Sequence, residues 1–466
     1  MFQKDFIYTG VLFPTMTFGI HGKKKLYRCR PSVSELNDIY IPYKIDGQVP
    51  IYVLFRYKEM DANGKHIGTM TEKIGVVNHE ESFYKYLVHC SGLVPLSFPK
   101  TLSIPKNKIE NLSSRKLWNI FTIDPESTRD YDDAFSIREV SPNCFHLSIY
   151  IANVPLFLEE NKLWNLLQDR VSTVYLPETN ISLLPKILSE DECSLHAGKE
   201  RMVFCMDVMI AHDKIDTIRF DKCLIVVNNN FAYEEKKLLK HKDYRLLHTI
   251  TKKIFESPTI DSHSLVSKWM IFMNHHCAKK LEKGILRCSE KIMNVNPLFE
   301  YKGKYISTEE KDKEHVPLHL DIYTHITSPI RRIVDIFNMM HLQHELGIFH
   351  FSEKTLEACN AWLLRLDYIN ETMNKIRKVQ QQCKWIHLLK TTPNLQEEGF
   401  ILEKVELDEE MRWKYLVYFP SLNMVKNIYT IDHTKHLNTK IKCNFYYFPK
   451  EISFQRKVRV EFGCSS

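Results

Sequence analysis

Four closely spaced aspartates are the group in this sequence best suited to chemistry. Asp124, Asp130, Asp132 and Asp133 fall within ten residues, directly after the apolar run Phe121–Ile123. These carboxylates cannot all be buried without partners, because their charges repel one another and burial removes their hydration. The group is therefore either a solvated polar turn or a site for a cation.

The neighbouring residues favour the cation site. Core-type residues such as Ile123 and Phe135 flank the aspartates closely, and Pro125 stiffens the turn. A calcium loop of the EF-hand kind does not fit, because the glutamate at its twelfth position and its central glycine are both missing. Carboxylates combined with water are the ligands that Mg²⁺ prefers, and such sites usually serve phosphate chemistry.

A second candidate group is the run Thr-Ser-Pro-Ile-Arg-Arg that ends at Arg332. Ser328 suits the N-cap and Pro329 the first position of a predicted helix, so Arg331 and Arg332 would lie in its first turn and oppose its dipole. An Arg331–Asp335 pair at i, i+4 spacing would account for one arginine structurally. Arginines at the positive end of a helix also form a phosphate site, and we favour that interpretation.

The elements that must position these groups follow from the apolar patterns. Residues 8 to about 110 alternate in short strand-like runs such as Ile39–Pro42 and predict a small β-barrel. The pattern from 117 to about 390 mixes strands with helices, and strands return from Gly399 onward. The predicted fold class is therefore α+β, with a mixed α/β central domain flanked by small OB-type β-barrels.

Two helices are predicted in the central part. Residues 263–283 place apolar side chains on one face, and Gly284 would be the C′ residue that ends the helix. A longer helix is expected from about Glu353 to Leu389, with apolar residues repeating at helical spacing. Both helices follow the predicted strands of the central part in the sequence.

The composition is that of a globular protein. A length of 466 residues predicts two to four domains, and a net charge of +7 permits a polyanionic partner without requiring one. The twelve cysteines include no C-x-x-C pair, which argues against a zinc ribbon or a disulfide scaffold. We see no signal peptide or membrane-length apolar run, so we expect a soluble, intracellular protein of the cytoplasm or the nucleus.

Four blocks in order resemble the catalytic domain of the RNase II (RNB-domain) family of 3′→5′ exoribonucleases, in a shortened form closer to the eukaryotic, exosome-type pattern. The first block is the aspartate group with the following Ala134-Phe-Ser136. The others are Tyr150–Val154, the segment from Arg170 to Leu195, and the segment from Tyr323 to Asp335. The resemblance covers positions 121 to about 341.

This resemblance implies a domain organisation and an activity. Residues 1–111 would form a cold-shock or OB-like RNA-binding barrel, 112–390 the RNB catalytic domain, and 391–466 an OB-type RNA-binding barrel. The activity implied is Mg²⁺-dependent hydrolysis of single-stranded RNA to nucleoside 5′-monophosphates by a two-metal mechanism, with Mn²⁺ as a substitute ion. The implied partner is single-stranded RNA, with RNA-decay complexes as further candidates and no membrane.

The family's functional residues transfer to matching positions. The metal ligands would be Asp124, Asp130, Asp132 and Asp133, and the catalytic residues Asp132 and Arg331. The residues implied to bind RNA are Tyr175, Arg332 and Tyr323. Without the resemblance, Tyr175 would be interpreted as a core tyrosine, since apolar residues surround it.

Two departures from the family motivate an alternative. Only about 110 residues precede the catalytic domain, which leaves room for one barrel where members commonly have two. Ser267 and Lys268 stand where the family usually has acidic residues, so a ribose contact is expected to be lost. The alternative is a catalytically weak or inactive RNB-fold protein that binds RNA or acts as an adaptor.

Overall fold

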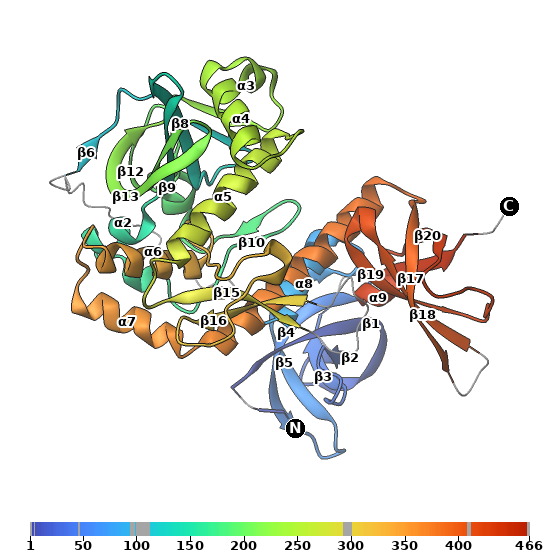
Figure 1. Ribbon diagram of the computed structural model, residues 1–466. Helices are drawn as coiled ribbons and strands as arrows, with labels where there is room; N and C mark the ends of the chain where they lie inside the picture. Colours follow the sequence, from blue (N-terminus) through green and yellow to red (C-terminus); the bar gives the residue numbers. More distant parts are fainter. Residues whose placement is uncertain are drawn as a thin grey trace. The chain divides into compact units, whose positions relative to one another are not determined.

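The computed structural model describes residues 2–3, 5–44, 47–93, 98, 112–291, 301–407 and 412–463. The chain divides into two compact units, whose elements are labelled in Figure 1. The first unit consists of Met1–Pro95, Tyr175–Thr179 and Asn374–Ser466, and the second of Leu96–Val174 and Asn180–Met373. Strands and helices are both abundant in the described residues, which confirms the predicted α+β class.

A closed five-stranded barrel in the order β1-β2-β3-β5-β4 opens the first unit. Its strands are β1 (Ile7–His21), β2 (Lys24–Pro31), β3 (Ile39–Tyr43), β4 (Ile51–Met60) and β5 (His66–Val76). Alternate residues such as Ile39 and Ile41 fill the barrel, as the sequence pattern predicts. The helix α1 (Glu80–Cys90) follows, within a stretch for which the sequence had indicated strands alone.

The end of the first unit is a second β-structure. Five antiparallel strands in the order β19-β18-β17-β20-β21 curl into a nearly closed barrel (Figure 1). They are β17 (Gln396–Leu407), β18 (Arg412–Phe419), β19 (Met424–Thr430), β20 (Lys440–Tyr447) and β21 (Val458–Phe462), with the short helix α9 (Phe454–Lys457) before the last strand. The predicted return of strands near the C-terminus is confirmed.

A buried lysine joins the two β-structures of the first unit. Lys457 is only 1% exposed, and its ammonium donates to the carbonyl oxygens of Val77 at 2.9 Å and Pro449 at 2.5 Å. It also lies 5.1 Å from the centre of the Phe83 ring. Nearby, the Tyr52 hydroxyl donates to the carbonyl of Ile452 at 2.8 Å. These contacts satisfy the buried charge and connect distant parts of the chain.

The second unit is built on a seven-stranded sheet in the order β14-β7-β8-β9-β12-β13-β6. The outermost strands β14 and β6 pair in parallel with their neighbours, and the inner pairs are antiparallel. The strands are β6 (Ser113–Ser114), β7 (Phe121–Asp124), β8 (Asp133–Ser141), β9 (Cys144–Ala152), β12 (Glu200–Ala211), β13 (Lys214–Val226) and β14 (Asn229–Ala232).

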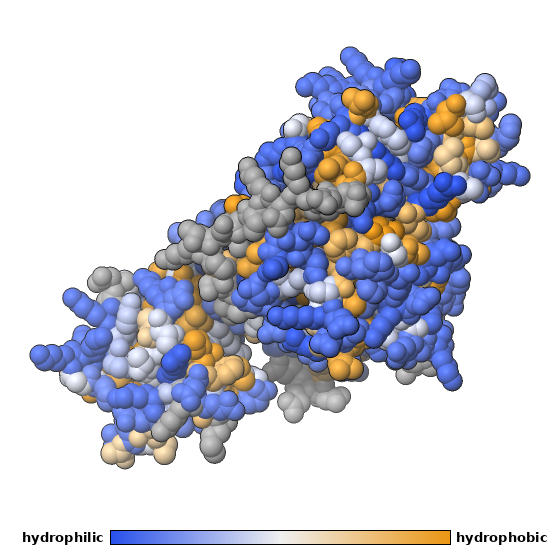
Figure 2. All heavy atoms as spheres, turned by 90° about the vertical axis from the view of Figure 1, so that its left-hand side faces the viewer, coloured by the Kyte–Doolittle hydropathy of each residue, from blue (hydrophilic) through white to orange (hydrophobic). Residues whose placement is uncertain are grey.

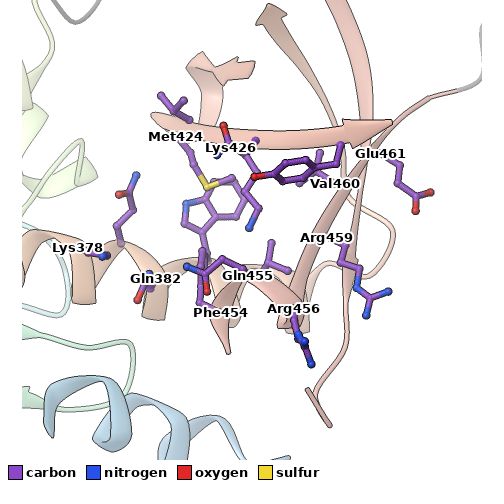
Figure 3. Close-up of a pocket in the computed structure, with 16 residues that line it drawn as sticks. Lys378, Gln382, Met424, Lys426, Phe454, Gln455, Arg456, Arg459, Val460 and Glu461 are labelled. Atoms are coloured by element: carbon purple, nitrogen blue, oxygen red, sulfur yellow. The ribbon is translucent and has the colours of Figure 1, made fainter. Parts of the chain in front are cut away.

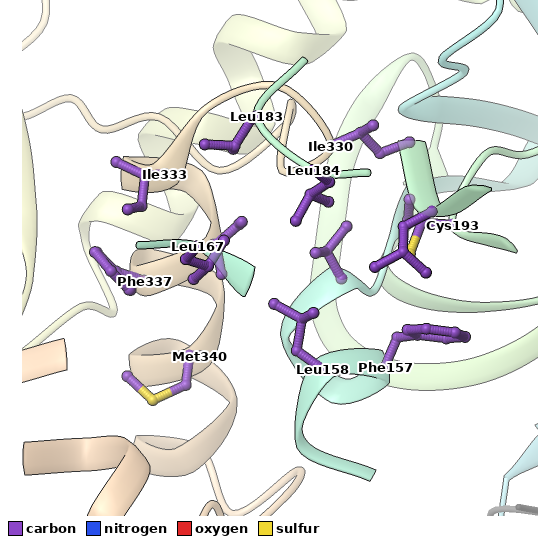
Figure 4. Close-up of a cluster of buried hydrophobic side chains, with 14 of the residues drawn as sticks. Phe157, Leu158, Leu167, Leu183, Leu184, Cys193, Ile330, Ile333, Phe337 and Met340 are labelled. Atoms are coloured by element: carbon purple, nitrogen blue, oxygen red, sulfur yellow. The ribbon is translucent and has the colours of Figure 1, made fainter. Parts of the chain in front are cut away.

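Helices cover both faces of this sheet. One face packs through residues such as Phe135 against α4 (Lys242–Ile254) and α5 (Ser262–Ala278). The other packs against α2 (Val154–Glu160), α6 (Ile333–Glu345) and α7 (Glu353–Leu363), and Figure 4 shows side chains of α2 and α6 converging in that core. The remaining elements are β10 (Val174–Tyr175), β11 (Asn180–Ile181), α3 (Lys236–Lys240), the hairpin β15 (Ile285–Lys291) with β16 (Tyr301–Ser307), and α8 (Leu366–Thr391).

The predicted end of the first central helix was wrong. The helix α5 stops at Ala278, because the backbone N–H groups of Glu282 and Lys283 turn away and donate to the Glu345 carboxylate, each at 2.9 Å. Gly284 is not a C′ residue. A Cβ there would lie 2.6 Å from Leu281 Cδ2 and 2.8 Å from Asn338 Oδ1, so a larger residue would force these side chains to shift.

The predicted long helix was also wrong as a single element. It is divided into α7 and α8 after Leu363, where Arg365 pairs with Asp169 at 2.7 Å and stacks on the Trp362 ring at 4.3 Å. Apolar periodicity continues across the break, so the sequence pattern alone did not reveal it.

Hydrophilic side chains cover most of the face seen in Figure 2, with smaller hydrophobic patches between them. Within the described residues, we find no helix with the length and hydrophobicity that a membrane span needs.

Candidate active site

The four aspartates come together at the end of two neighbouring strands. Asp124 is the last residue of β7 and Asp133 the first of β8, so the loop between these strands carries Asp130 and Asp132. Strands β7 and β8 pair through Phe121 and Phe135, which places both ends of the loop at one edge of the sheet. The apolar flanks noticed in the sequence are therefore the strands that hold the acidic loop.

Ser194 holds the backbone of the acidic loop in place through two hydrogen bonds. This fully buried residue accepts a hydrogen bond from the backbone N–H of Tyr131 at 2.9 Å and donates its hydroxyl to the carbonyl of Arg129 at 2.9 Å. The next residue, Leu195, donates its N–H to the carbonyl of Tyr131 at 3.1 Å. Two of the blocks found in the sequence are thus in direct contact.

Asp132 connects the acidic loop to the arginine segment. It is 4% exposed, and its carboxylate accepts from the backbone N–H of Ile330 at 2.9 Å and from Arg331 Nε at 3.0 Å. The Arg331 side chain remains 42% exposed, and its Nη2 donates to Ser328 Oγ at 2.8 Å. The two predicted catalytic residues therefore form an ion pair with one face open to solvent.

Burial raises the pKa of Asp132 to about 7, although Arg331 and the N–H of Ile330 act in the opposite direction. Burial also raises the pKa of Asp124, and the charges of Asp132 and Asp130 add to the shift. The pKa of Asp133 is raised well above its usual range by burial and by the charge of Asp124. These carboxylates are therefore costly to ionise together without a cation.

Two carboxylate oxygens have the environment of metal ligands. The Oδ2 atoms of Asp124 and Asp133 are buried and have no hydrogen-bond partner. Across the described residues, no three or more His, Cys, Asp or Glu side chains are already arranged around one point as ligands. Mg²⁺ is usually held by one or two carboxylates and several water molecules. The donor set at Asp124 and Asp133 therefore fits Mg²⁺, with Asp130 and Asp132 beside it.

The two adjacent arginines have different partners. Arg332, not Arg331, pairs with Asp335, with Nε 2.8 Å from Oδ2 and Nη2 donating to Oδ1 at 2.8 Å. The Arg331–Asp335 alternative was therefore wrong, because Arg331 turns toward Asp132. The RNA-binding role of Arg332 stays a prediction, and the structure adds that its charge is balanced by a fully buried carboxylate.

The predicted helix start at Ser328 was wrong as well. Helix α6 begins at Ile333, because the N–H groups before it are used elsewhere. The N–H of Ser328 donates to Asp335 Oδ1 at 2.7 Å and that of Ile330 donates to Asp132. The segment is a turn that presents Arg331 to the acidic loop.

Tyr323, a predicted RNA-binding residue, lies in the interior of the second unit. It is 6% exposed, and its hydroxyl accepts from Asn274 Nδ2 at 3.0 Å. The Asn274 side chain also accepts from the N–H of Ile326 at 2.9 Å and lies 3.3 Å from Thr327 Oγ1. Asn274 on α5 thereby holds the segment that leads into Arg331, and an RNA contact by Tyr323 stays a prediction.

Tyr175 belongs to the first unit. It is partly exposed and lines a cavity of about 560 Å³ with cationic and amide side chains of the second half of α8, among them Arg377, Gln380, Lys384 and His387. This surrounding differs from the apolar core that the neighbouring sequence suggested. Base stacking by Tyr175 stays a prediction.

Sequence reasoning missed Tyr233. This residue follows β14, which pairs in parallel with β7, and its backbone N–H donates to the carbonyl of Asp124 at 3.0 Å. Burial raises the pKa of the Tyr233 hydroxyl, and the charges of Asp133 and Asp124 add to that shift, so a protonated hydroxyl lies near the carboxylates. The sequence signal that could have indicated Tyr233 is its position directly after a short strand. Parallel pairing of that strand with β7 brings the ends of the two strands together.

A family model and a curated relative match this chain. Residues 110–256 match the RNB domain. DIS3-like exonuclease 2 of Caenorhabditis elegans is 22% identical over a region that covers 86% of this chain and 60% of the nematode protein. The chain thus spans about 60% of the length of that relative.

Solved structures share the fold at low sequence identity. RNase R of Mycoplasma genitalium, in complex with ribose-methylated single-stranded RNA, matches with a TM-score of 0.76 and 15% identity, over 98% of this chain and 89% of that one. Yeast Ssd1, described as a pseudonuclease, matches with a TM-score of 0.67 and 14% identity, over 94% of this chain and 67% of that one. The mixed α/β unit and its barrels are therefore an RNase R-like fold.

Proposed function

We propose that this chain, whose residues 110–256 match the RNB domain, is a member of the RNase II/R family and a Mg²⁺-dependent 3′→5′ exoribonuclease that hydrolyses single-stranded RNA to nucleoside 5′-monophosphates. The observation that carries the proposal is the contact between Asp132 and Arg331, which brings the acidic loop and the arginine segment into one site. All four aspartates of the site are present, as hydrolysis requires.

The chemistry follows from the residues of the site. When bound, two Mg²⁺ ions, for which Mn²⁺ is a substitute, supply an activated water and stabilise the leaving 3′-oxygen. Asp124 and Asp133, whose Oδ2 atoms are buried without hydrogen-bond partners, would hold the cations, with Asp130 and Asp132 completing the acidic surroundings. Asp132 also orients Arg331, whose open side meets the phosphate and offsets its growing negative charge.

RNA binding and domain boundaries are part of the same proposal. Tyr175 stacks on a base, and Arg332 and Tyr323 support the strand near the catalytic residues. We place an RNA-binding barrel at 1–111, the catalytic domain at 112–390 and a second RNA-binding barrel at 391–466. The start of the RNB match at residue 110 supports the first boundary.

A second candidate function is an RNA-binding or adaptor protein without nuclease activity. The likeness to a structure described as a pseudonuclease supports it, as do Ser267 and Lys268 at usually acidic positions. The Nζ of Lys268 lies 5.4 Å from the centre of the Phe255 ring, so its ammonium group contacts an aromatic side chain of the protein. The presence of all four aspartates favours the enzyme.

One experiment separates the two candidates. A 5′-labelled oligo(A) is incubated with the purified protein and Mg²⁺, with Mn²⁺, or with EDTA, and the products are run on a denaturing gel. The enzyme leaves products shortened stepwise from the 3′ end in either metal and none in EDTA. An intact oligonucleotide in both metals, bound but not cut, contradicts the nuclease and supports the adaptor. A matching oligo(dA) measures discrimination against DNA.

A further inference from the structure

A cavity of about 590 Å³ lies in the first unit, and none of the residues assigned to the proposed reaction lines it. It is bounded by the second half of α8, strands β19 and β21, and helix α9 (Figure 3). The volume is within the range of small-ligand pockets, and one nucleotide fits it in size.

Cations without acidic partners line this cavity. Lys378 of α8, Lys426 of β19 and Arg456 of α9 all line it, and no carboxylate within the described residues forms an ion pair with any of them. The acidic residue that lines the cavity is Glu461, which Figure 3 shows on the opposite side of the view from Lys378. Arg459, also on the wall, is already paired with Glu451 at 2.9 Å. The cavity therefore has an excess of positive charge.

Lys426 is the most unusual of these cations. Burial lowers its pKa to about 8, and its Nζ lies 4.8 Å from the centre of the Phe454 ring. A half-buried ammonium beside an aromatic face is poorly solvated. An anion in the cavity would stabilise its charged form.

Aromatic and amide groups complete the lining. Three aromatic residues line the cavity: Tyr429, which is 61% exposed, Phe454, and Trp385, whose ring stacks on Phe445 at 5.5 Å. Amide groups that could pair with the edge of a base also line it: Gln381, Gln382, Asn427 and Gln455. Stacking surfaces beside cations are the combination that binds single-stranded nucleic acid.

We propose that this cavity binds one phosphate-bearing nucleotide, with the phosphate at Lys426 and Arg456 and the base against Tyr429. The nucleotide is an internal unit of the RNA that the proposed enzyme degrades, or a free nucleoside monophosphate with the same chemistry. The inference rests on the proposed function for its substrate class. An acidic peptide is less suited, because it would leave the amides and the exposed ring without partners.

The test uses Lys426→Gln combined with Arg456→Gln in the full chain carrying Asp132→Asn, so that no RNA is cut. The control is Lys442→Gln combined with Lys450→Gln, which removes two exposed lysines of the same β-structure outside the cavity. Binding of a fluorescent oligo(A) is measured by anisotropy in EDTA at several salt concentrations. Binding of AMP is measured by calorimetry.

For an internal nucleotide, we expect the cavity variant to weaken oligo(A) binding about 10-fold and to lower the slope of log K against log salt by about 1.4, with little change in the control. AMP binding that only the cavity variant loses identifies the free nucleotide as the occupant. Equal effects of both variants on oligo(A) and AMP overturn the inference, as does selective loss of binding to an acidic peptide. Because nothing is cut in this assay, a protein inactive in the gel experiment can still pass it, and an active one can fail it.

Discussion

Two acidic sites of the second unit, Asp207 and the acidic loop with its four aspartates, differ in how their charge is balanced. Asp207 on β12 accepts hydrogen bonds of 2.7 Å from both terminal nitrogens of Arg115 and one of 2.5 Å from Ser148. Burial works against its ionisation, but hydrogen bonds from His146, Arg115 and Ser148 outweigh burial and hold the pKa of Asp207 below its usual range. Its charge is satisfied within the fold.

The acidic loop shows the opposite balance. Asp132 has partners in Arg331 and Ile330, but Asp124 and Asp133 each keep a buried oxygen with no hydrogen bond, and the pKa values of all three carboxyls are raised. Residue type and burial alone therefore do not distinguish a structural carboxylate from a functional one. The two kinds of carboxylate differ in whether the protein itself supplies their hydrogen-bond and ion-pair partners.

The strongest test of this difference is Asp132→Asn. The substitution keeps the size of the side chain but removes a charge from the acidic loop, so we expect hydrolysis of oligo(A) to fall to below about 1% of the wild-type rate. RNA binding in EDTA should be retained, because the contacts to the rest of the strand remain. Turnover close to wild type in a folded protein would contradict the assignment of the loop as the catalytic site.

The next test compares the two arginines. Arg331→Ala should reduce the rate about 100-fold or more, since it removes the charge that faces the phosphate. Arg332→Ala leaves the buried Asp335 unpaired, and we expect it to lower the free energy of unfolding by about 3 kcal/mol. Rates are measured per folded molecule and stability by urea denaturation. Normal turnover by folded Arg331→Ala would mean that Arg331 only supports Asp132 structurally.

The substitution Asp207→Asn tests the carboxylate whose charge is balanced within the fold. It leaves the guanidinium of Arg115 buried without a charged partner, so we expect a loss of about 3 kcal/mol in unfolding free energy with normal activity per folded molecule. Because the pKa of Asp207 is depressed in the folded state, its stabilisation should be present above the ordinary aspartate pKa and be lost in more acidic solution. A selective loss of activity would remove the contrast with the acidic loop.

The acidic loop predicts the reverse pH dependence. A folded-state pKa of about 7 for Asp132 means that this carboxyl destabilises the fold progressively as pH rises from the ordinary value near 4 to about 7, and fully above that. Mg²⁺ should therefore raise the melting temperature by about 2–4 °C at pH 8 and much less at pH 5. Asp124→Asn is expected to lose most of this shift in thermal denaturation. An equal shift at both pH values would place the bound ion elsewhere.

The smallest expected effect is that of Tyr175→Ala, a substitution outside both the acidic loop and the Asp207 site. Loss of stacking on one base costs about 1–3 kcal/mol of binding free energy. This loss weakens the binding of short RNA more than that of long RNA, because long RNA keeps many phosphate contacts. Long RNA should be attacked at nearly the normal rate, more slowly at high salt, and the end product should be longer than that of the wild type. A denaturing gel gives its length. An unchanged length with a folded variant would make Tyr175 a structural residue.

Local patterns in the sequence predicted the elements better than the pairings. Alternation in Ile39–Pro42 led correctly to a strand of the first barrel, and the aspartates were recognised because their apolar flanks are strands β7 and β8. The split between α7 and α8 and the end of α5 could not be predicted, because each depends on one long-range contact, Arg365 to Asp169 and Glu345 to the backbone of Glu282.

The same limit applies to the candidate site. Spacing along the chain allowed Asp335 to pair with either arginine, and the choice depends on Asp132, which is distant in sequence but adjacent in space. Tyr233 was missed because its neighbour Asp124 lies on a strand that pairs in parallel, a relation that no local pattern carries. Residues that share one motif could therefore be grouped from the sequence, and contacts that depend on sheet topology could not.

The buried ammonium of Lys457 has a consequence for how the chain is made. Its acceptor Val77 lies 380 residues earlier in the sequence. The hydrogen bond between Tyr52 and Ile452 likewise joins residues 400 positions apart. At a synthesis rate of about 5–20 residues per second, the first barrel emerges from the ribosome roughly 20–75 seconds before these contacts can form. During that interval the Val77 carbonyl and the Phe83 ring are open to water or to chaperones. The first barrel of this sequence is thus completed by a segment that is translated 380 residues later.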